Sequence, residues 1–217
     1  MVLQPAQGAL IARLKQPGDT ADAGIDIRNA DGEVVARLVA VNQTRATDPA
    51  IVDCLFRWRA ASMTGFLTVF EPTVDKTRGY LEKLVLTDPA RILFLILDPA
   101  GRPVGNIGLC NVTGADAEVD NIVRGERVET PNFMAQVQAG LIAWAQERLG
   151  VERVYLNVLS DNERAVNSYL KAGYVETGRT PLTREAIEGG YRLVPTPGGG
   201  DPAEPTLIQM RIDLSHD

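Results

Sequence analysis

The spacing of apolar residues changes twice in the second half of the chain. Residues 118–123 form a short run rich in β-branched side chains, which predicts a strand. Residues 131–149 place apolar side chains at helical spacing, residues 151–159 alternate with period two, and Asp161 and Asn162 then open another helix. The helical apolar positions are Met134, Val137, Leu141, Trp144, Ala145 and Leu149.

This order of elements indicates where a site would form. A strand, a crossover helix and a returning strand usually make a right-handed parallel unit. Small ligands tend to bind at the carboxyl ends of such strands, where a loop leads into a helix N-terminus. We therefore expect the functional chemistry between residues 117 and 174.

The preceding part of the chain predicts a hairpin and a helix. Residues 24–42 alternate on either side of Asp31-Gly32, a dipeptide that favours a type I′ hairpin turn. Thr47 or Asp48 caps the next helix, which has a proline at its first position. The apolar face of this helix is Ile51, Val52, Leu55 and Trp58.

Strands dominate the remaining predictions. A helix that starts at Thr73 leads to residues 91–98, a nearly continuous apolar strand. Residues 104–112 predict the next strand, and residues 175–177 and 207–214 predict two more near the C-terminus.

A long segment with a weak pattern separates the last two predicted strands. Residues 183–194 are compatible with a short helix and a strand, whereas glycines and prolines favour disorder for residues 195–205. Residues 1–23 are expected to be a loose lead-in, and residues 24–217 to be a single α/β domain whose last part, 180–217, holds this loop and the final strand.

Composition restricts the function without deciding it. The chain has 217 residues, of which 45% are hydrophobic and 23% charged, as in ordinary globular proteins. Its net charge of −6 argues against a nucleic-acid partner and is compatible with a cationic amine substrate. Cys54 and Cys110 are expected to be core thiols of a reducing compartment. The sequence has no signal peptide and no apolar run long enough to span a membrane, which favours a cytoplasmic protein without a membrane partner.

The helix after Asp161 carries a recognisable motif. The run Asn162-Glu-Arg-Ala165-Val-Asn-Ser-Tyr169-Leu-Lys-Ala-Gly173-Tyr174 resembles the N-x-x-A-x-x-x-Y-x-x-x-G-F/Y signature of the GNAT superfamily of N-acetyltransferases. The resemblance covers about residues 45–179. It implies an α/β fold in which helices flank a mixed central sheet. The hairpin at 24–42 is then an addition to this core, unless its second strand is the first strand of the sheet.

The resemblance assigns roles to two residues of the motif. In this family the tyrosine, here Tyr169, protonates the thiolate of coenzyme A as it leaves. A phenol is a plausible acid for a thiolate because their ordinary pKa values lie close together. Tyr169 can instead be a core tyrosine with a satisfied hydroxyl. Asn162, two helical turns earlier, would contact the cofactor and can also cap the helix.

Two carboxylates are candidates for the base. Glu118 and Asp120 lie two apart on a predicted strand and therefore share one face. The family can use a strand carboxylate at the position of Glu118 to deprotonate the amine, often through water. An ammonium must lose a proton before it attacks a thioester, so either a carboxylate or water must accept that proton. Both side chains can alternatively be solvated charges or only position the substrate.

The resemblance also implies a seat for acetyl coenzyme A as co-substrate. Backbone amides of Ile122, Val123 and Arg124 would hold the pantetheine arm and the thioester oxygen. The pyrophosphate would bind at the turn from Gly125 to Asn132, because a helix N-terminus offers free amides there.

The phosphate loop departs from the family pattern Q/R-x-x-G-x-G/A. Arg124 fits the first position, but Arg127 and Glu129 stand where small residues are expected, and Gly125 is out of register. A carboxylate beside a phosphate is unfavourable. A changed donor or a non-catalytic binding module on the same fold therefore stays open.

The run Arg57-Trp58-Arg59 sits near the expected acceptor site. The pattern F-R-W-R-x-x-x-M resembles the W-R-N region of bacterial acetyltransferases that modify nucleotide-linked amino sugars. Arginine suits phosphates and carboxylates. Positions two apart on a helix diverge by about 200°, so only one arginine can face the cleft, and we expect Arg59. Trp58 is assigned to the acceptor site as well, although a buried tryptophan between surface arginines fits the same pattern.

The sequence thus predicts an acetyl-CoA-dependent N-acetyltransferase for a primary amine. The favoured acceptor is an amino sugar, free or nucleotide-linked, and a protein amine or a polyamine is the alternative. The only histidine is His216, so neither a catalytic triad nor a metal site can be assembled around it. A homodimer is left open.

Overall fold

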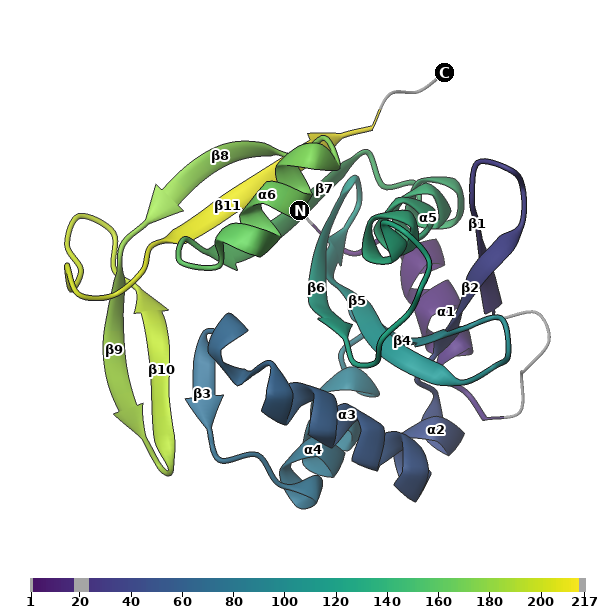
Figure 1. Cartoon of the computed structure of the whole chain (residues 1–217), viewed down its shortest axis with the longest axis horizontal. Coiled ribbons are helices and arrows are strands. Elements are labelled where there is room, and N and C mark those ends of the chain that lie inside the picture. Colours follow the sequence, from purple (N-terminus) through teal and green to yellow (C-terminus); the bar gives the residue numbers. More distant parts are fainter. Residues whose placement is uncertain (1, 18–23, 215–217) are drawn as a thin grey trace.

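The computed structural model describes residues 2–17 and 24–214, and an eight-stranded sheet runs through this part of the chain (Figure 1). Its order is β1-β2-β4-β5-β6-β7-β11-β8. All neighbouring strands are antiparallel except β6 and β7, which are parallel. The strands are β1 (Gly24–Arg28), β2 (Val34–Ala40), β4 (Ile92–Leu97), β5 (Pro103–Thr113), β6 (Asp116–Arg124), β7 (Arg153–Leu159), β8 (Val175–Thr180) and β11 (Leu207–Asp213).

A second sheet and the helices complete the described residues. The small sheet has the order β3-β10-β9 and lies at the end of the molecule opposite β1 and β2 (Figure 1). Its strands are β3 (Thr68–Phe70), β9 (Leu182–Ile187) and β10 (Gly190–Pro195). The α-helices are α1 (Pro5–Leu14), α2 (Gln43–Thr47), α3 (Pro49–Ala61), α4 (Val74–Tyr80), α5 (Phe133–Leu149) and α6 (Glu163–Lys171). Among the described helices, none is both long and apolar enough to cross a membrane.

Strand β4 explains why the sheet has helices on both faces. Its residues are almost all apolar, and they alternate between two cores. Phe94 and Ile96 point to a core shared with α1 and α5, whereas Leu93 and Leu95 point to a core shared with α3 and the π-helical turn Leu81–Val85. A strand buried on both faces is expected to read as a continuous apolar run, as residues 91–98 do.

The unit β6-α5-β7 has the predicted order, and its two strands are parallel neighbours. They pair only from Asp116 to Glu118, opposite Arg153 to Tyr155, and then part. On its other side β6 contains a bulge, because Asn121 and Ile122 together oppose Ile107 of β5. Asn121 adopts a left-handed conformation there, with φ of 51°. The parting and the bulge create the site described below.

Several helix and strand ends agree with the sequence predictions. Asp48 caps α3 by accepting a hydrogen bond from the Ala50 amide (2.8 Å), and Thr73 caps α4 by accepting one from the Lys76 amide (3.1 Å). Residues 24–42 form the expected hairpin, whose second strand β2 pairs with β4 and so belongs to the main sheet.

The turn of this hairpin differs from the prediction. A type I′ turn needs positive φ at both central residues, but among Asn29 to Glu33 only Gly32 has one, at 83°. The Gly32 amide donates to the Asn29 carbonyl (3.0 Å), and the register of the hairpin shifts between Ile27 and Arg28. The loop is therefore a turn followed by a left-handed glycine with a bulge, which accommodates a longer connection.

Three expectations about irregular segments need correction. The lead-in contains α1, whose Ile11 is completely buried in the main core; residues 18–23 of the lead-in lie outside the described residues. Residues 183–194 form the hairpin of β9 and β10 and contain no helix. Instead of the expected disordered segment, residues 196–206 carry turns held by backbone hydrogen bonds and by an ion pair between Arg184 and Glu204 (2.7 Å).

The start of α5 also differs from the prediction, in which the helical pattern begins at residue 131. The helix begins at Phe133, after Asn132 in a left-handed conformation with φ of 52°. The Asn132 carbonyl accepts hydrogen bonds from the amides of Ala135 (3.0 Å) and Gln136 (3.1 Å). The chain turns sharply at Asn132, so the helical pattern of the sequence extends two residues too far.

Replacement of Ile11 by alanine tests whether α1 belongs to the core. The completely buried side chain should lose about 2–5 kcal/mol of unfolding free energy through lost burial and a residual cavity. Arg13→Ala on the exposed face of the same helix should change stability by less than about 0.5 kcal/mol. Urea denaturation measures both, and equal midpoints for the two variants would show that α1 is only a loose lead-in.

Candidate active site

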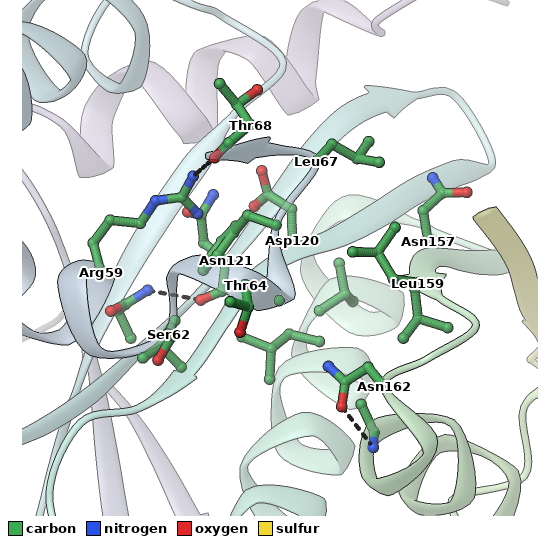
Figure 2. A pocket seen from close by; sticks show the side chains of 18 of the residues that line it. Arg59, Ser62, Thr64, Leu67, Thr68, Asp120, Asn121, Asn157, Leu159 and Asn162 are labelled. Carbon is green, nitrogen blue, oxygen red and sulfur yellow. Dashed lines mark hydrogen bonds between the residues drawn. The ribbon is translucent and has the colours of Figure 1, made fainter. Parts of the chain in front are cut away.

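A cleft with a volume of about 1160 Å³ opens where β6 and β7 part (Figure 2). Predicted site residues that line it are Arg59, Glu118, Asp120, Ile122, Val123, Arg124, Asn162 and Tyr169. Trp58, Gly125 and Asn132 are not among its lining residues. The fold thus gathers side chains from α3, β6 and α6 around one cavity, although α3 and α6 lie about 100 residues apart in sequence.

Backbone groups of β6 face this cleft for a simple geometric reason. Within a sheet, each strand would use its amides and carbonyls on both edges. Beyond Glu118 the β7-facing edge of β6 has no ladder partner, because the pairing with β7 ends there. The bulge on the other edge is fixed by Asn106, whose Nδ2 donates to the Asn121 carbonyl (2.7 Å). The free edge at Ile122 to Arg124 is therefore a rigid row of hydrogen-bonding groups.

Glu118 is held by two side-chain amides. Asn111 Nδ2 donates to Glu118 Oε2 (2.7 Å), and Asn157 Nδ2 of β7 donates to Glu118 Oε1 (2.8 Å). Both donors are neutral, so Glu118 has no ion-pair partner among the described residues, and each of its oxygens retains a free lone pair. A carboxylate in this state can still accept a proton.

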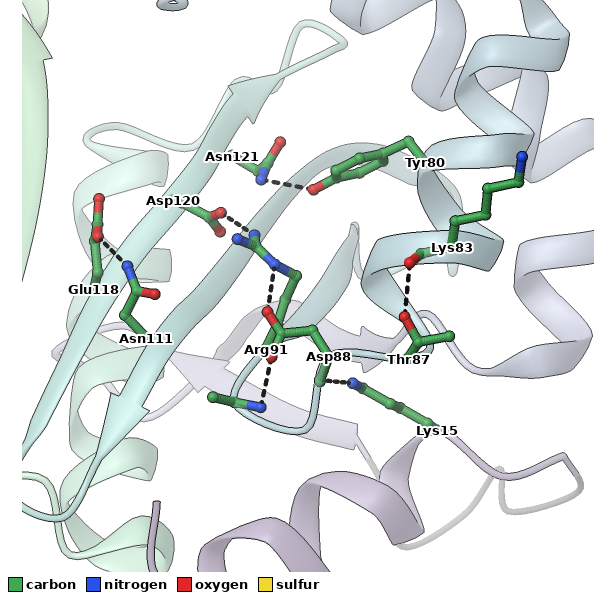
Figure 3. Close-up of polar contacts among 11 residues, drawn as sticks. Lys15, Tyr80, Lys83, Thr87, Asp88, Arg91, Asn111, Glu118, Asp120 and Asn121 are labelled. Carbon is green, nitrogen blue, oxygen red and sulfur yellow. Dashed lines mark hydrogen bonds and ion pairs between the residues drawn. The ribbon is translucent and has the colours of Figure 1, made fainter. Parts of the chain in front are cut away.

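Asp120, on the same face of β6, has a different environment (Figure 3). It forms an ion pair with Arg91, and Arg91 in turn lies 3.6 Å from Asp88. Burial alone would lower the pKa of Arg91, but the neighbouring Asp120 raises it above the usual value. Protonation of Asp120 would break this ion pair in a partly buried setting, which is costly. Asp120 is therefore the less suitable base.

Tyr169 reaches the cleft from the core side of α6. Its ring packs edge-on against Tyr174, with centroids 6.0 Å apart, and only 9% of the residue is exposed. Burial raises the pKa of Tyr169 to about 12, so the hydroxyl stays protonated at neutral pH. Asn162 lines the same cleft, and its Oδ1 also caps α6 by accepting from the Ala165 amide (3.3 Å).

Arg59 and Arg57 separate as the helical period predicts. Arg59 lines the cleft, donates from Nη2 to the Thr68 carbonyl (2.9 Å), and lies with Cζ 3.3 Å from the ring centroid of Phe66. Burial lowers the pKa of Arg59 to about 10. Arg57 lies outside the cleft lining, where it pairs with Asp53 (2.8 Å) and Glu126 (3.5 Å).

Trp58 supports the loop after β6 instead of lining the cleft. It is 2% exposed, and its indole Nε1 donates to Glu126 Oε1 (3.0 Å). A Cβ atom at Gly125 would lie 2.1 Å from the Trp58 ring, so this position needs glycine. The amides of Gly125 and Glu126 both donate to the Val104 carbonyl (2.9 Å each), which removes them as phosphate donors. Trp58 therefore packs beneath the loop after β6 and does not line the cleft in which an acceptor would bind.

The remaining part of the loop is exposed. Arg127 and Glu129, which interrupt the expected small-residue pattern, form an ion pair with each other (3.0 Å). Both side chains are more than four-fifths exposed. Glu129 thus carries its own counterion, which reduces its repulsion of a nearby phosphate.

Sequence reasoning missed several polar residues of the cleft. Tyr80 gives no polar signal within the predicted helix that starts at Thr73, but its hydroxyl accepts a hydrogen bond from Asn121 Nδ2 (3.0 Å), and burial raises its pKa to about 12. Arg91 begins an apolar strand and gives no signal of its pairing with Asp120. Asn157 had a signal, since it is polar on the non-core face of an alternating strand directly before the motif.

The lining residues carry more positive than negative charge. The cations are Arg59, Lys76, Arg91, Arg124 and Arg164, and the carboxylates are Glu118, Asp120 and Asp161. This excess contrasts with the net charge of −6 of the whole chain. Among the described residues, no group of three or more His, Cys, Asp or Glu side chains could hold a metal ion.

Comparison with solved structures shows the same fold in acetyltransferases. Spermidine N-acetyltransferase from Vibrio cholerae, in complex with CoA and spermine, is 19% identical, with a TM-score of 0.60 over 82% of this chain and 95% of that one. A dodecameric structure of that enzyme is 17% identical, with a TM-score of 0.57 over 82% and 93%. A probable acetyltransferase of the GNAT family from Chromobacterium violaceum is 15% identical, with a TM-score of 0.64 over 90% and 88%.

The family follows from the sequence match. No curated protein matches the chain in sequence. The family described as the Acetyltransferase (GNAT) domain matches residues 37–175, well over half of the chain, and its match begins within β2. It includes both walls of the cleft and the motif from Asn162 to Tyr174. The chain belongs to the GNAT family of acetyltransferases, enzymes that use acetyl-CoA as co-substrate.

Proposed function

We propose that the protein transfers an acetyl group from acetyl-CoA to the primary amine of an amino sugar, free or nucleotide-linked. The observation that carries this proposal is the cleft between the parted strands, which Glu118 lines from one wall and Tyr169 from the other. Direct transfer needs a group that accepts the ammonium proton and a group that donates to the leaving thiolate. In this proposal Glu118 accepts the ammonium proton and Tyr169 donates to the leaving thiolate.

The backbone and two cations would hold the co-substrate. The free edge of β6 at Ile122 to Arg124 offers amides to the pantetheine arm and the thioester oxygen. Arg124 and Arg164 line the cleft and suit the phosphates. Because the Gly125 and Glu126 amides are already used, the pyrophosphate contacts fall to these cations and to the amides after Asn132 at the start of α5.

Glu118 is the base in this proposal. It accepts the proton of the acceptor ammonium, directly or through a water, and the free amine then attacks the thioester carbonyl. Asn111 and Asn157 fix both carboxylate oxygens without neutralising the charge. Asp120 instead holds Arg91 and shapes the cleft floor.

Tyr169 is the acid. Its pKa of about 12 ensures that the proton is present, but full transfer to an ordinary thiolate would be unfavourable by about 5 kcal/mol. Burial in the same cleft also raises the pKa of the leaving thiol and narrows this difference. The hydroxyl therefore stabilises the forming thiolate by hydrogen bonding and gives up its proton as the carbon–sulfur bond breaks. The products are the amide and free coenzyme A. The second proton lost by the amine nitrogen restores the Tyr169 hydroxyl through water, and the proton on Glu118 returns to solvent.

The charge of the cleft supports a sugar-type acceptor over a polycation. A polyamine needs several free carboxylates along its length. Of the three carboxylates in the lining, Asp120 is paired with Arg91 and Glu118 is assigned to catalysis. Arg59 contributes an additional buried positive charge on the acceptor side.

A polyamine acceptor is the second candidate, favoured by the structural likeness to spermidine N-acetyltransferase. That likeness, at 19% identity, supports the fold and leaves the acceptor open. Steady-state kinetics with acetyl-CoA and a panel of amines separates the candidates: amino sugars, nucleotide-linked amino sugars, spermidine and peptides. The proposal expects the highest kcat/KM with an amino sugar, and a clear preference for spermidine or peptides would contradict it. The homodimer considered from sequence stays a prediction.

Glu118→Gln should identify the base. The substitution keeps the size and one of the two asparagine contacts but removes the proton acceptor, so kcat should fall by a factor on the order of 10² to 10⁴. Acetyl-CoA affinity, measured by calorimetry, should stay unchanged. The matched variant Asp120→Asn should lower thermal stability more than kcat, because it leaves Arg91 without its ion pair. A larger loss of kcat in Asp120→Asn would transfer the role to Asp120.

Tyr169→Phe should lower kcat with little effect on acetyl-CoA binding. The wild-type pH–rate profile should show no loss of activity from this residue up to about pH 10, because a pKa of about 12 keeps the hydroxyl protonated there. The exposed neighbour variant Leu170→Ala is the control for helix α6. If Tyr169→Phe retains the full rate at every pH, the tyrosine serves only for packing.

A further inference from the structure

A partly buried cation at the acceptor end of the cleft, Arg59, has no carboxylate partner among the described residues. The Arg59 guanidinium lies 3.3 Å from the ring centroid of Phe66 and 5.7 Å from that of Phe70. Its only hydrogen bond in the described structure goes to the Thr68 carbonyl (2.9 Å). A guanidinium has five N–H donors, so most of them are left for a ligand. A partly buried charge without a counterion is unfavourable, and an anionic ligand would relieve that cost.

A second cation stands beside the same aromatic ring. Lys76 Nζ lies 5.1 Å from the Phe70 centroid and donates to the Glu71 carbonyl (2.8 Å). Lys76 lines the cleft rim, and no described carboxylate pairs with it. The neighbouring arginines differ in this respect, because Arg57 pairs with Asp53 and Arg78 pairs with Asp75. Of these four cations on α3 and α4, the two without a described carboxylate partner, Arg59 and Lys76, are the two that line the cleft.

The hairpin of β9 and β10 holds this part of the cleft in place. Strand β3, which carries Thr68, pairs with residues 190–192 of β10, and the Leu193 amide donates to the Leu67 carbonyl (2.7 Å). Leu67 also packs against buried Leu182 and Leu193 of the hairpin. The hairpin lies beyond residue 175, where the family match ends. Arg59 is thus positioned by a segment that the shared family core does not include.

We propose that Arg59, with Lys76 at the rim, forms a subsite for a phosphate or diphosphate group carried by the acceptor. This inference rests on the proposed function, because it divides the cleft into a cofactor half and an acceptor half. Arginine binds phosphate through paired N–H donors, and the Phe66 ring keeps the guanidinium plane fixed for that contact. Phe70 offers an apolar surface between the two cations. The acceptor class is then a phosphorylated or nucleotide-linked amino sugar, and a polyamine would be repelled.

Calorimetry on CoA-saturated protein tests the subsite, because bound CoA prevents a nucleotide from occupying the cofactor half. The probes are uridine diphosphate, glucosamine 6-phosphate and inorganic pyrophosphate, which distinguish a nucleotide, a sugar phosphate and a bare diphosphate. We expect at least one probe to bind. Arg59→Gln, which keeps a donor for the Thr68 carbonyl, should weaken it by about 10- to 100-fold. Lys76→Ala should weaken it by about two- to fivefold.

Arg57→Ala is the matched control for Arg59 on α3, and Arg78→Ala is the matched control for Lys76 on α4. Each removes a positive charge from the same helix without changing a residue of the cleft lining. Both should keep the wild-type affinity for the probe, and thermal melting checks that all variants fold. The subsite is ruled out if no probe binds, if Arg57→Ala weakens binding as much as Arg59→Gln, or if Arg59→Gln weakens CoA instead. Turnover of amines without a phosphate group by the wild-type protein, alongside any of these results, would leave the proposed acetyl transfer intact. Absence of turnover with every amine would contradict that function independently of probe binding.

Discussion

The parting of β6 and β7 after Glu118 is the constraint on which the rest of the site depends. Two parallel strands that stayed paired would use their amides and carbonyls on each other and leave no room between them. Here pairing ends after Glu118 and Tyr155, and the bulge at Asn121 turns β6 away from β7. The left-handed backbone at Asn121 is held by Asn106 and Tyr80. A local irregularity of one strand thus opens the cleft.

The two walls of the opening place the reactive groups. Glu118 lies at the last paired position of β6, where Asn157 of β7 can still reach it. Tyr169 reaches the cleft from α6, the helix that follows the free end of β7. The proposed base on β6 and the proposed acid on α6 therefore reach one cavity from two sides, and neither needs a flexible segment to bring it there.

The sequence predicted those features that depend on local periodicity. The β6-α5-β7 unit, the caps at Asp48 and Thr73, and the direction of Arg59 follow from spacings of two and 3.6 residues. The features it did not predict depend on contacts between distant segments. Trp58 packs on Gly125, 67 positions later, and the 183–194 segment forms strands because it pairs with β3. The hydrogen-bond partners of Glu118, Asn111 and Asn157, come from two other strands, so no local sequence pattern predicts them.

The same contrast between local pattern and long-range contacts explains why the sequence identifies the family but not the acceptor. The family match covers the β6-α5-β7 unit and the Asn162 motif, to which we assign the cofactor half of the cleft. The proposed acceptor half includes β3 and the hairpin of β9 and β10, and the hairpin lies outside that match. The family match therefore establishes acetyl transfer as the family chemistry, whereas the structures at 15–19% identity share the fold and leave the acceptor to the side chains of this chain.

Amide hydrogen exchange with and without acetyl-CoA tests the central claim most directly, because that claim assigns the co-substrate to the free edge of β6. The account predicts slower exchange for residues 119–124 and for the start of α6 when acetyl-CoA is bound, with β1 and β2 unchanged. Binding by calorimetry without added protection of residues 119–124 would contradict it, since the co-substrate would then occupy another part of the molecule.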